Sequence, residues 1–135
     1  PDGVVHADMG EPFDQRLRAV WINACEKAQT PVISTGIYGA FEGPRFETRA
    51  EIRAAQAMGV TVVGMTVVPE VILANELAIP YACISLVVNP ATGLGTQPVT
   101  IEEINVVIAQ GSETVKKILA LAAQSLATLQ DQGAY

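Results

Sequence analysis

The hydrophobic positions along the chain change their period several times, and each change marks a predicted element. Apolar residues spaced by three and four positions predict an amphipathic helix close to the N-terminus, namely Phe13, Leu17, Val20, Trp21, Ala24 and Cys25. The β-branched and aromatic run 31–38 then predicts a strand, and the glycines and proline of 39–46 predict a loop. The chain is therefore expected to begin with a helix, a strand and a loop.

The middle of the chain repeats the alternation. Residues 48–51, Thr-Arg-Ala-Glu, match a capping box and open a helix that we expect to end at Gly59. The apolar run 60–65 predicts a second strand. Pro69 is typical of the first position of a helix, which we expect to continue to about Ala78.

The last part of the chain contains one more predicted strand and one long helix. Residues 81–88 are apolar throughout, as expected of a strand buried on both faces. Residues 89–99 are rich in Gly, Pro and Thr and predict a loop. A second capping box at 100–103 begins a helix toward Leu129.

Strands separated by short helices are the signature of a parallel sheet covered by helices. The predicted fold class is α/β, three-layered, with a mostly parallel or mixed sheet and helices on both faces. Ligands of such sheets gather at the carboxyl ends of the strands, so the loops 43–48, 65–69 and 89–93 should meet there.

Size and composition favour one domain segment spanning residues 1–135. Half of the residues are apolar and only 16% are charged, which indicates apolar surface covered by an oligomeric partner or a companion segment. The net charge of -6, without a basic cluster, argues against nucleic acid as a partner. No apolar run reaches the roughly 18 residues of a membrane span. Cys25 and Cys83, far apart and without a CxxC motif, predict reduced buried thiols in a cytoplasmic protein and no metal site.

The three loops carry side chains that suit a flat heterocycle joined to a sugar. The ring of Phe46 can stack on a base, Glu47 can accept a ring N–H, and the Asn89 amide can both donate and accept. Thr66 precedes a helix N-terminus, which favours an anion such as phosphate. Each residue also has a plainer interpretation: Phe46 as core, Glu47 and Thr66 as helix-start residues, and Asn89 as a turn residue.

The runs 38–48, 63–70 and 81–90 resemble the purine nucleoside and methylthioadenosine phosphorylases. The resemblance covers nearly the whole chain and corresponds to the C-terminal half of such an enzyme. It implies phosphorolysis of the N-glycosidic bond of a purine nucleoside, with inorganic phosphate as co-substrate and no cofactor or metal. It also implies a homo-oligomer, expected to be a trimer, and a complementary N-terminal half that carries most of the phosphate site.

By this resemblance Phe46, Glu47, Asn89 and the position of Ala91 contact the base, and Asn89 stabilises the departing purine anion. The resemblance makes Met65 a ribose contact and Thr66 a phosphate contact. Asparagine and glutamate at these base positions imply a 6-oxopurine, because its N1–H can donate to Glu47. Mispairing of such a buried group costs about 1–3 kcal/mol. Apolar residues at the expected 5' position favour a methylthio group, as in 5'-methylthioinosine, and these residues are Ile104, Val107 and Ile108, with His6 reaching across a subunit interface.

Two other functions remain open at this point. The chain could be a truncated binding module that holds a nucleoside or another aromatic ligand without phosphate chemistry. It could also be an interaction subunit whose sheet edge pairs with a complementary chain. His6 in particular has a plain alternative as a solvated residue near a terminus.

Overall fold

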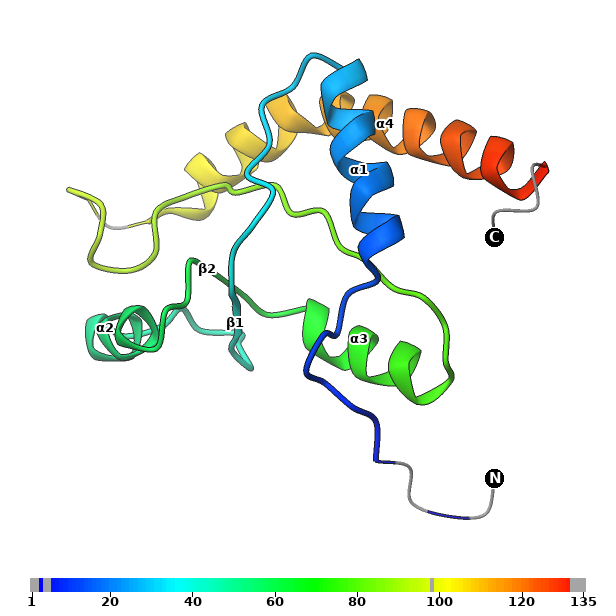
Figure 1. Cartoon of the computed structure of the whole chain (residues 1–135). Helices are drawn as coiled ribbons and strands as arrows, with labels where there is room; N and C mark the ends of the chain where they lie inside the picture. Colours follow the sequence, from blue (N-terminus) through cyan, green and yellow to red (C-terminus); the bar gives the residue numbers. More distant parts are fainter. Residues whose placement is uncertain (1–2, 4–5, 98, 132–135) are drawn as a thin grey trace.

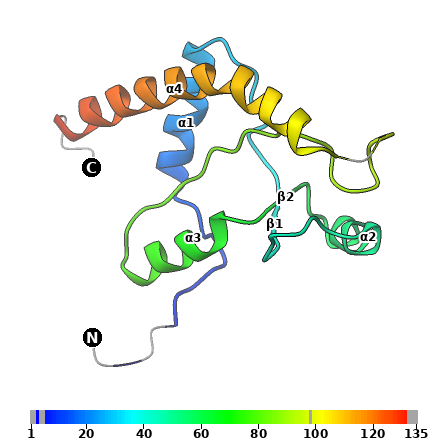
Figure 2. The ribbon, with the colours of Figure 1, turned by 180° about the vertical axis from the view of Figure 1, so that it is seen from behind.

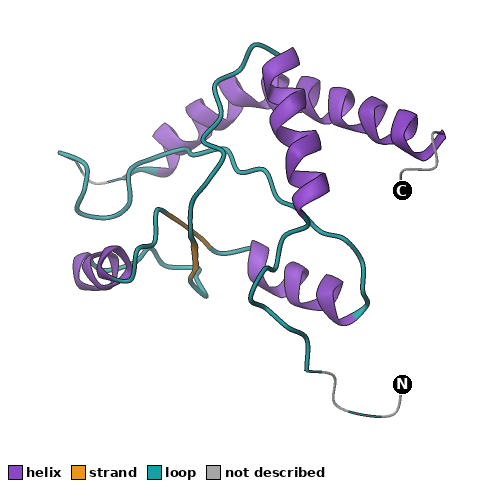
Figure 3. Ribbon diagram, viewed as in Figure 1, coloured by secondary structure: helices purple, strands orange, loops and turns teal. Residues whose placement is uncertain are grey.

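The computed structural model describes residues 3, 6–97 and 99–131. Helices dominate these ranges, and a short parallel sheet lies between α2 and the rest of the chain (Figures 1 and 3). The elements, in chain order, are α1 (Gln15–Lys27), β1 (Tyr38–Ala40), α2 (Arg49–Ala57), β2 (Val62–Gly64), α3 (Val67–Glu76) and α4 (Ile101–Asp131).

The predicted helices are confirmed, and local side chains explain where three of them begin. The Asp14 carboxylate caps α1 by accepting from the backbone N–H groups of Arg16 and Leu17, both at 2.9 Å. Thr48 and Glu51 form the predicted capping box of α2. At the start of α4, Thr100 and Glu103 make the same reciprocal pair at 3.3 and 3.4 Å. Pro69 is the third residue of α3 rather than the first, because that helix begins at Val67.

The main core lies where α1 crosses the C-terminal half of α4 (Figures 1 and 2). Its fully or almost fully buried residues are small on α1, which lets the two helices approach closely, and Trp21 packs against their edge. The core residues are Val20, Ala24, Cys25, Ala28, Ile118 and Ala122. The predicted amphipathic face of the first helix is thus confirmed. Of the two cysteines, both of them free thiols, only Cys25 is buried, so the prediction that Cys83 is buried is wrong.

The sheet consists of β1 and β2, paired in parallel with Tyr38 opposite Val62 and Ala40 opposite Gly64. The parallel pairing confirms the orientation expected from the helix between them. Tyr38 lies over Gly64, and a side chain at that position would force the Tyr38 side chain to move. Both strands are only three residues long, so the sheet is smaller than the sequence predicts.

Two predicted strands are not formed as expected. The strand predicted over 31–38 is reduced to its last residue, Tyr38, and residues 81–88 form no strand within the described structure. No backbone-to-backbone hydrogen bond joins residues 82–88 to another described residue. Nor are they buried on both faces, since Val87 is 64% exposed. A strand needs a neighbour for its N–H and C=O groups. Residues 82–88 have none among the described residues, and in 31–37 the Ile37 carbonyl alone accepts backbone hydrogen bonds from a neighbouring segment, from the N–H groups of Thr61 and Val62.

None of the helices in the described ranges combines the length and the apolar character that crossing a bilayer requires.

Candidate functional site

The loop 43–48 lies between β1 and α2 and presents two adjacent side chains in different ways. Gly43 begins it with a positive φ of 72°, a conformation that glycine adopts without strain. A Cβ on Gly43 would lie 2.7 Å from the Met65 sulfur, so the loop passes directly against the end of β2. Phe46 is 42% exposed and Glu47 is 6% exposed, and Glu47 is the one buried charged residue of the described chain.

Residues 89–97 and Val99 form the opposite wall. This segment begins with Asn89, whose side-chain amide donates to the Pro90 carbonyl at 2.8 Å. A turn closed by the hydrogen bond from Leu94 N–H to the Ala91 carbonyl follows, and Gly93, with φ of 85°, lies against the side chain of Arg49. The second N–H and the Oδ1 atom of Asn89 have no partner among the described residues, so both remain available to a ligand.

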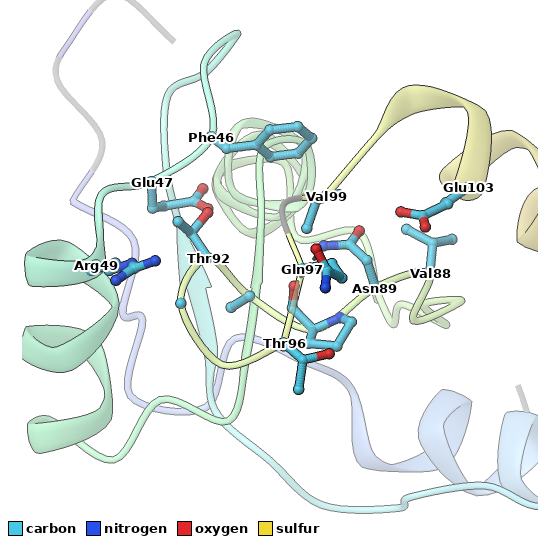
Figure 4. Close-up of a pocket in the computed structure, with 14 residues that line it drawn as sticks. Phe46, Glu47, Arg49, Val88, Asn89, Thr92, Thr96, Gln97, Val99 and Glu103 are labelled. Atoms are coloured by element: carbon cyan, nitrogen blue, oxygen red, sulfur yellow. Dashed lines mark hydrogen bonds between the residues drawn. The ribbon is translucent and has the colours of Figure 1, made fainter.

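These two loops line an open cavity of about 680 Å³, which is the size of a small-molecule site. Figure 4 shows Glu47 and Asn89 pointing into it from opposite sides, with the Phe46 ring above them. Four predicted base-contact residues line this cavity together, and they are Phe46, Glu47, Asn89 and Ala91. An aromatic face, a carboxylate and a carboxamide around one space can stack on a flat ring and read the N–H and acceptor groups of its edge.

Met65 and Thr66 lie beside this cavity without lining it. Met65 is half-buried and packs against Gly43, so it supports the loop 43–48 without facing the cavity. Thr66 is exposed at the N-cap of α3, and within the described structure its side chain makes no capping hydrogen bond. Its hydroxyl is therefore available to an anion, which the N-terminus of a helix favours. The third predicted loop thus contacts the loop 43–48 through Met65 and Gly43 but does not line the cavity.

The residues predicted at the 5' position are not gathered around the cavity. Ile104, Val107 and Ile108 lie on the first turns of α4. Of the described residues of α4, Glu103 lines the cavity and these three do not. His6 is exposed in the segment leading into α1 and lies outside the cavity. That segment runs beside α3, whose Asn75 side chain donates to the Pro12 carbonyl at 3.0 Å.

The structure adds cavity residues that the sequence reasoning missed. Arg49, the first residue of α2, lines the cavity, and so do Thr92, Thr96 and Gln97 of the opposite loop and Glu103 of α4 (Figure 4). Arg49 could have been found from its place next to Thr48, since the first turn of a helix that follows a ligand loop faces the same strand edge. The hydroxyls and Gln97 gave no signal beyond a polar loop composition. Among the described residues no group of three His, Cys, Asp or Glu side chains could hold a metal ion.

Residues 1–124 match the model of the phosphorylase superfamily. The chain is 44% identical over 119 residues to a probable S-methyl-5'-thioinosine phosphorylase of Methanosarcina acetivorans, covering 88% of this chain and 45% of that protein. It is 40% identical over 119 residues to a 6-oxopurine nucleoside phosphorylase of Pyrococcus furiosus, with the same coverage of 88% and 45%. The chain therefore spans about half the length of the curated relatives that it matches.

Solved structures of the same fold give the same result. The chain superimposes with a TM-score of 0.88 on the methylthioadenosine phosphorylase of Schistosoma mansoni in complex with adenine, at 29% identity. The superposition covers 94% of this chain and 50% of the Schistosoma chain. The predicted fold class, an α/β phosphorylase-like fold of which this chain contains about half, is confirmed by this likeness, and so is the predicted family resemblance.

Proposed function

The chain belongs to the phosphorylase superfamily, and from this premise we propose that it is the C-terminal half of a phosphorylase domain acting on 6-oxopurine nucleosides. The reaction is phosphorolysis of the N-glycosidic bond, which gives the free base and ribose 1-phosphate or its methylthio derivative. The observation that carries the proposal is the meeting of Phe46, Glu47 and Asn89 around one cavity. The names of the relatives at 40–44% identity agree with a 6-oxopurine substrate.

Each residue has a role that follows from its chemistry. Phe46 stacks on the purine, and Glu47 accepts the N1–H that a 6-oxopurine has and neutral adenine lacks. Asn89 uses its free N–H and Oδ1 at the imidazole edge and stabilises the negative charge that develops on the leaving base. Met65 contacts the ribose. Thr66, with the N-terminus of α3, holds part of the phosphate below the sugar.

The substituent at the 5' carbon is the finer part of the proposal. We favour 5'-methylthioinosine because the first turns of α4 present apolar side chains, Ile104, Val107 and Ile108. In one subunit His6 lies away from the cavity, so it contributes only if it reaches the site of a neighbouring subunit, as in a trimer. A cytoplasmic enzyme of purine salvage, with phosphate as co-substrate and no cofactor, completes the proposal.

The site also needs a complementary half. Thr66 is the one phosphate contact proposed in this chain, and residues 82–88 have exposed apolar side chains and unpaired backbone groups in the described structure. We propose that the remaining half of the phosphorylase fold, on the same or another polypeptide, pairs with this segment and supplies the other phosphate contacts.

The first test is release of free base from 5'-methylthioinosine, inosine or 5'-methylthioadenosine, with and without phosphate. The chain is assayed alone and with the part of the Methanosarcina relative that it does not match. Phosphate-dependent release, fastest from 5'-methylthioinosine, is expected with the complementing half. Binding of nucleoside without turnover under all conditions would instead favour the truncated binding module.

Variants of Asn89 sharpen this test. Asn89→Ala should lower the rate about 100-fold or more, the usual loss for one preorganised donor. Asn89→Asp should shift preference toward 6-aminopurines, because a carboxylate accepts from an amino group and cannot donate. Asn105→Ala, an exposed asparagine of α4 outside the cavity, is the matched control and should leave the rate unchanged.

A further inference from the structure

One carboxylate fastens the loop 43–48 to α2. Glu51 Oε1 accepts from Arg45 Nη2 at 2.8 Å, and Glu51 Oε2 accepts from Arg45 Nη1 at 2.9 Å, so the ion pair is bidentate. Glu51 Oε2 also accepts from the Thr48 backbone N–H at 2.6 Å and from its hydroxyl at 3.0 Å. Arg45 Nη1 in addition donates to the Phe46 carbonyl at 3.0 Å. Residues on both sides of Glu47 are thereby tied to α2.

The guanidinium of Arg45 lies under the influence of two carboxylates. Hydrogen bonds to Glu51 and the charge of Glu51 raise the pKa of Arg45, and the charge of Glu47 raises it further. The same contacts with Arg45, followed by those with Thr48, lower the pKa of Glu51 to about 2. Both partners are therefore fully ionised at neutral pH. An arginine retains its charge at any accessible pH, so its cation will pair with whichever carboxylate is best placed.

Glu47, two residues after Arg45, is the alternative partner. It is buried at the cavity, and its side chain makes no hydrogen bond with another described residue. If Arg45 turned to Glu47, the guanidinium would occupy the carboxylate oxygens that face the cavity. A ligand N–H would then have to displace a charge-assisted hydrogen bond before it could bind there.

We infer that Arg45 and Glu51 are positioning residues, in which Glu51 binds the Arg45 guanidinium and so leaves the Glu47 carboxylate free to accept an N–H from a 6-oxopurine. The inference rests on the proposed function for the identity of the ligand. The ion pair would set selectivity, because neutral adenine has no N1–H to donate and gains nothing from a free carboxylate at Glu47.

The test compares Glu51→Gln, Arg45→Met and the double variant in calorimetric titrations of the chain, combined with the complementing half, with hypoxanthine and with adenine. Glu51→Gln should weaken hypoxanthine binding about tenfold, the typical loss of one hydrogen bond to a charged group, while adenine binding holds or improves. The double variant removes the competing cation and should recover hypoxanthine affinity to within about threefold of the parent. Glu113→Gln, which breaks the exposed 2.7 Å pair with Lys116 on α4, is the control and should change neither affinity.

Two results would overturn the inference. One is an equal loss of affinity for both bases, which indicates a disturbed loop and not a captured carboxylate. The other is a double variant no better than Glu51→Gln alone. A crystal structure of Glu51→Gln gives a readout that does not depend on any ligand: Arg45 should lie within about 4 Å of the Glu47 carboxylate. If the parent chain, combined with the complementing half, binds neither base, the proposed function fails, and this distance alone decides whether Glu51 restrains Arg45.

Discussion

The helix pair α1 and α4 and the extended segments 31–37 and 82–88 all carry apolar side chains but differ in how they bury them. The helices bury a continuous core in which Ala24 is completely covered. The extended segments leave Ile33 90% exposed, and 82–88 makes no backbone pair with the described residues. A helix satisfies its own backbone groups, whereas a strand depends on its neighbours. This chain therefore completes its helices, whose backbone groups are paired within each element, and leaves residues 82–88 without backbone partners among the described residues.

The largest expected effect lies in the helix pair. Ile118→Ala removes a side chain that is 3% exposed at the crossing of α1 and α4, and it should lower the free energy of unfolding by about 2–5 kcal/mol. Urea denaturation followed by circular dichroism measures this loss. Leu119→Ala, on the neighbouring exposed position of α4, should change the same quantity by no more than about 0.5 kcal/mol. Equal effects would show that the helix pair is not the stable region.

The next prediction concerns the extended segment. In the chain alone, the amides of residues 82–88 should exchange with solvent almost without protection, because they lack backbone acceptors among the described residues. With the complementing half, we expect protection to rise about 100-fold, measured by hydrogen exchange and mass spectrometry.

Val87→Lys tests whether this protection comes from burial of the segment. A lysine at this 64% exposed position should leave the stability of the chain alone unchanged and weaken its association with the complementing half. Protection of 82–88 in the chain alone would contradict the comparison, since the segment would then already have a partner.

A smaller effect separates the two capping boxes. Thr48→Ala removes the hydroxyl half of the capping box whose other half, the Glu51 carboxylate, also binds Arg45. The substitution should cost about 1 kcal/mol of stability. Thr100→Ala, where the reciprocal bonds are 3.3 and 3.4 Å long, should cost less. Thermal unfolding of both variants checks the order, and a larger loss at Thr100 would reverse it.

The smallest predicted effect is a pH dependence. The pKa of Glu51 is about 2 in the folded chain, below its ordinary value of 4.5, so its ionised form stabilises the fold above about pH 4.5. This contribution should fade as the pH falls from 4.5 toward 2. Asp14 acts in the same direction, because its cap bond to Leu17 lowers its pKa. Urea midpoints between pH 2 and 6 should therefore fall less steeply with acidification in Glu51→Gln than in the parent chain.

The elements that could be predicted from the sequence are those whose causes are local. The apolar stripe of α1 and the capping boxes at Thr48 and Thr100 each place their partners within four residues, so the pattern contains the reason for the structure. The run 81–88 reads as a buried strand because its composition suits one. Its length and pairing depend on a neighbouring strand, and the sequence of this chain alone does not show which strand that is.

The candidate site divides in the same way. Phe46, Glu47, Asn89 and Ala91 follow predicted strands and were expected at one sheet edge, and the structure brings them into one cavity. Whether Arg49 and Glu103 reach the cavity depends on the orientation of α2 and α4 relative to that edge. The hydrophobic period of the two helices does not specify this orientation. The ion pair of Arg45 and Glu51 is not apparent from the sequence either, although Glu51 belongs to the predicted capping box at 48–51.

Gly43 offers a practical marker for sorting related sequences. Its backbone has a positive φ, and the Met65 sulfur lies close to where a Cβ atom would be. Both the path of the loop and its contact with Met65 therefore depend on the absence of a side chain at this position. A relative with a larger residue at this position would strain the backbone there and push aside the side chain of Met65, the proposed ribose contact. Among otherwise similar chains, glycine at this position should mark those that keep the base and ribose contacts together, and a larger residue should mark those that bind another ligand.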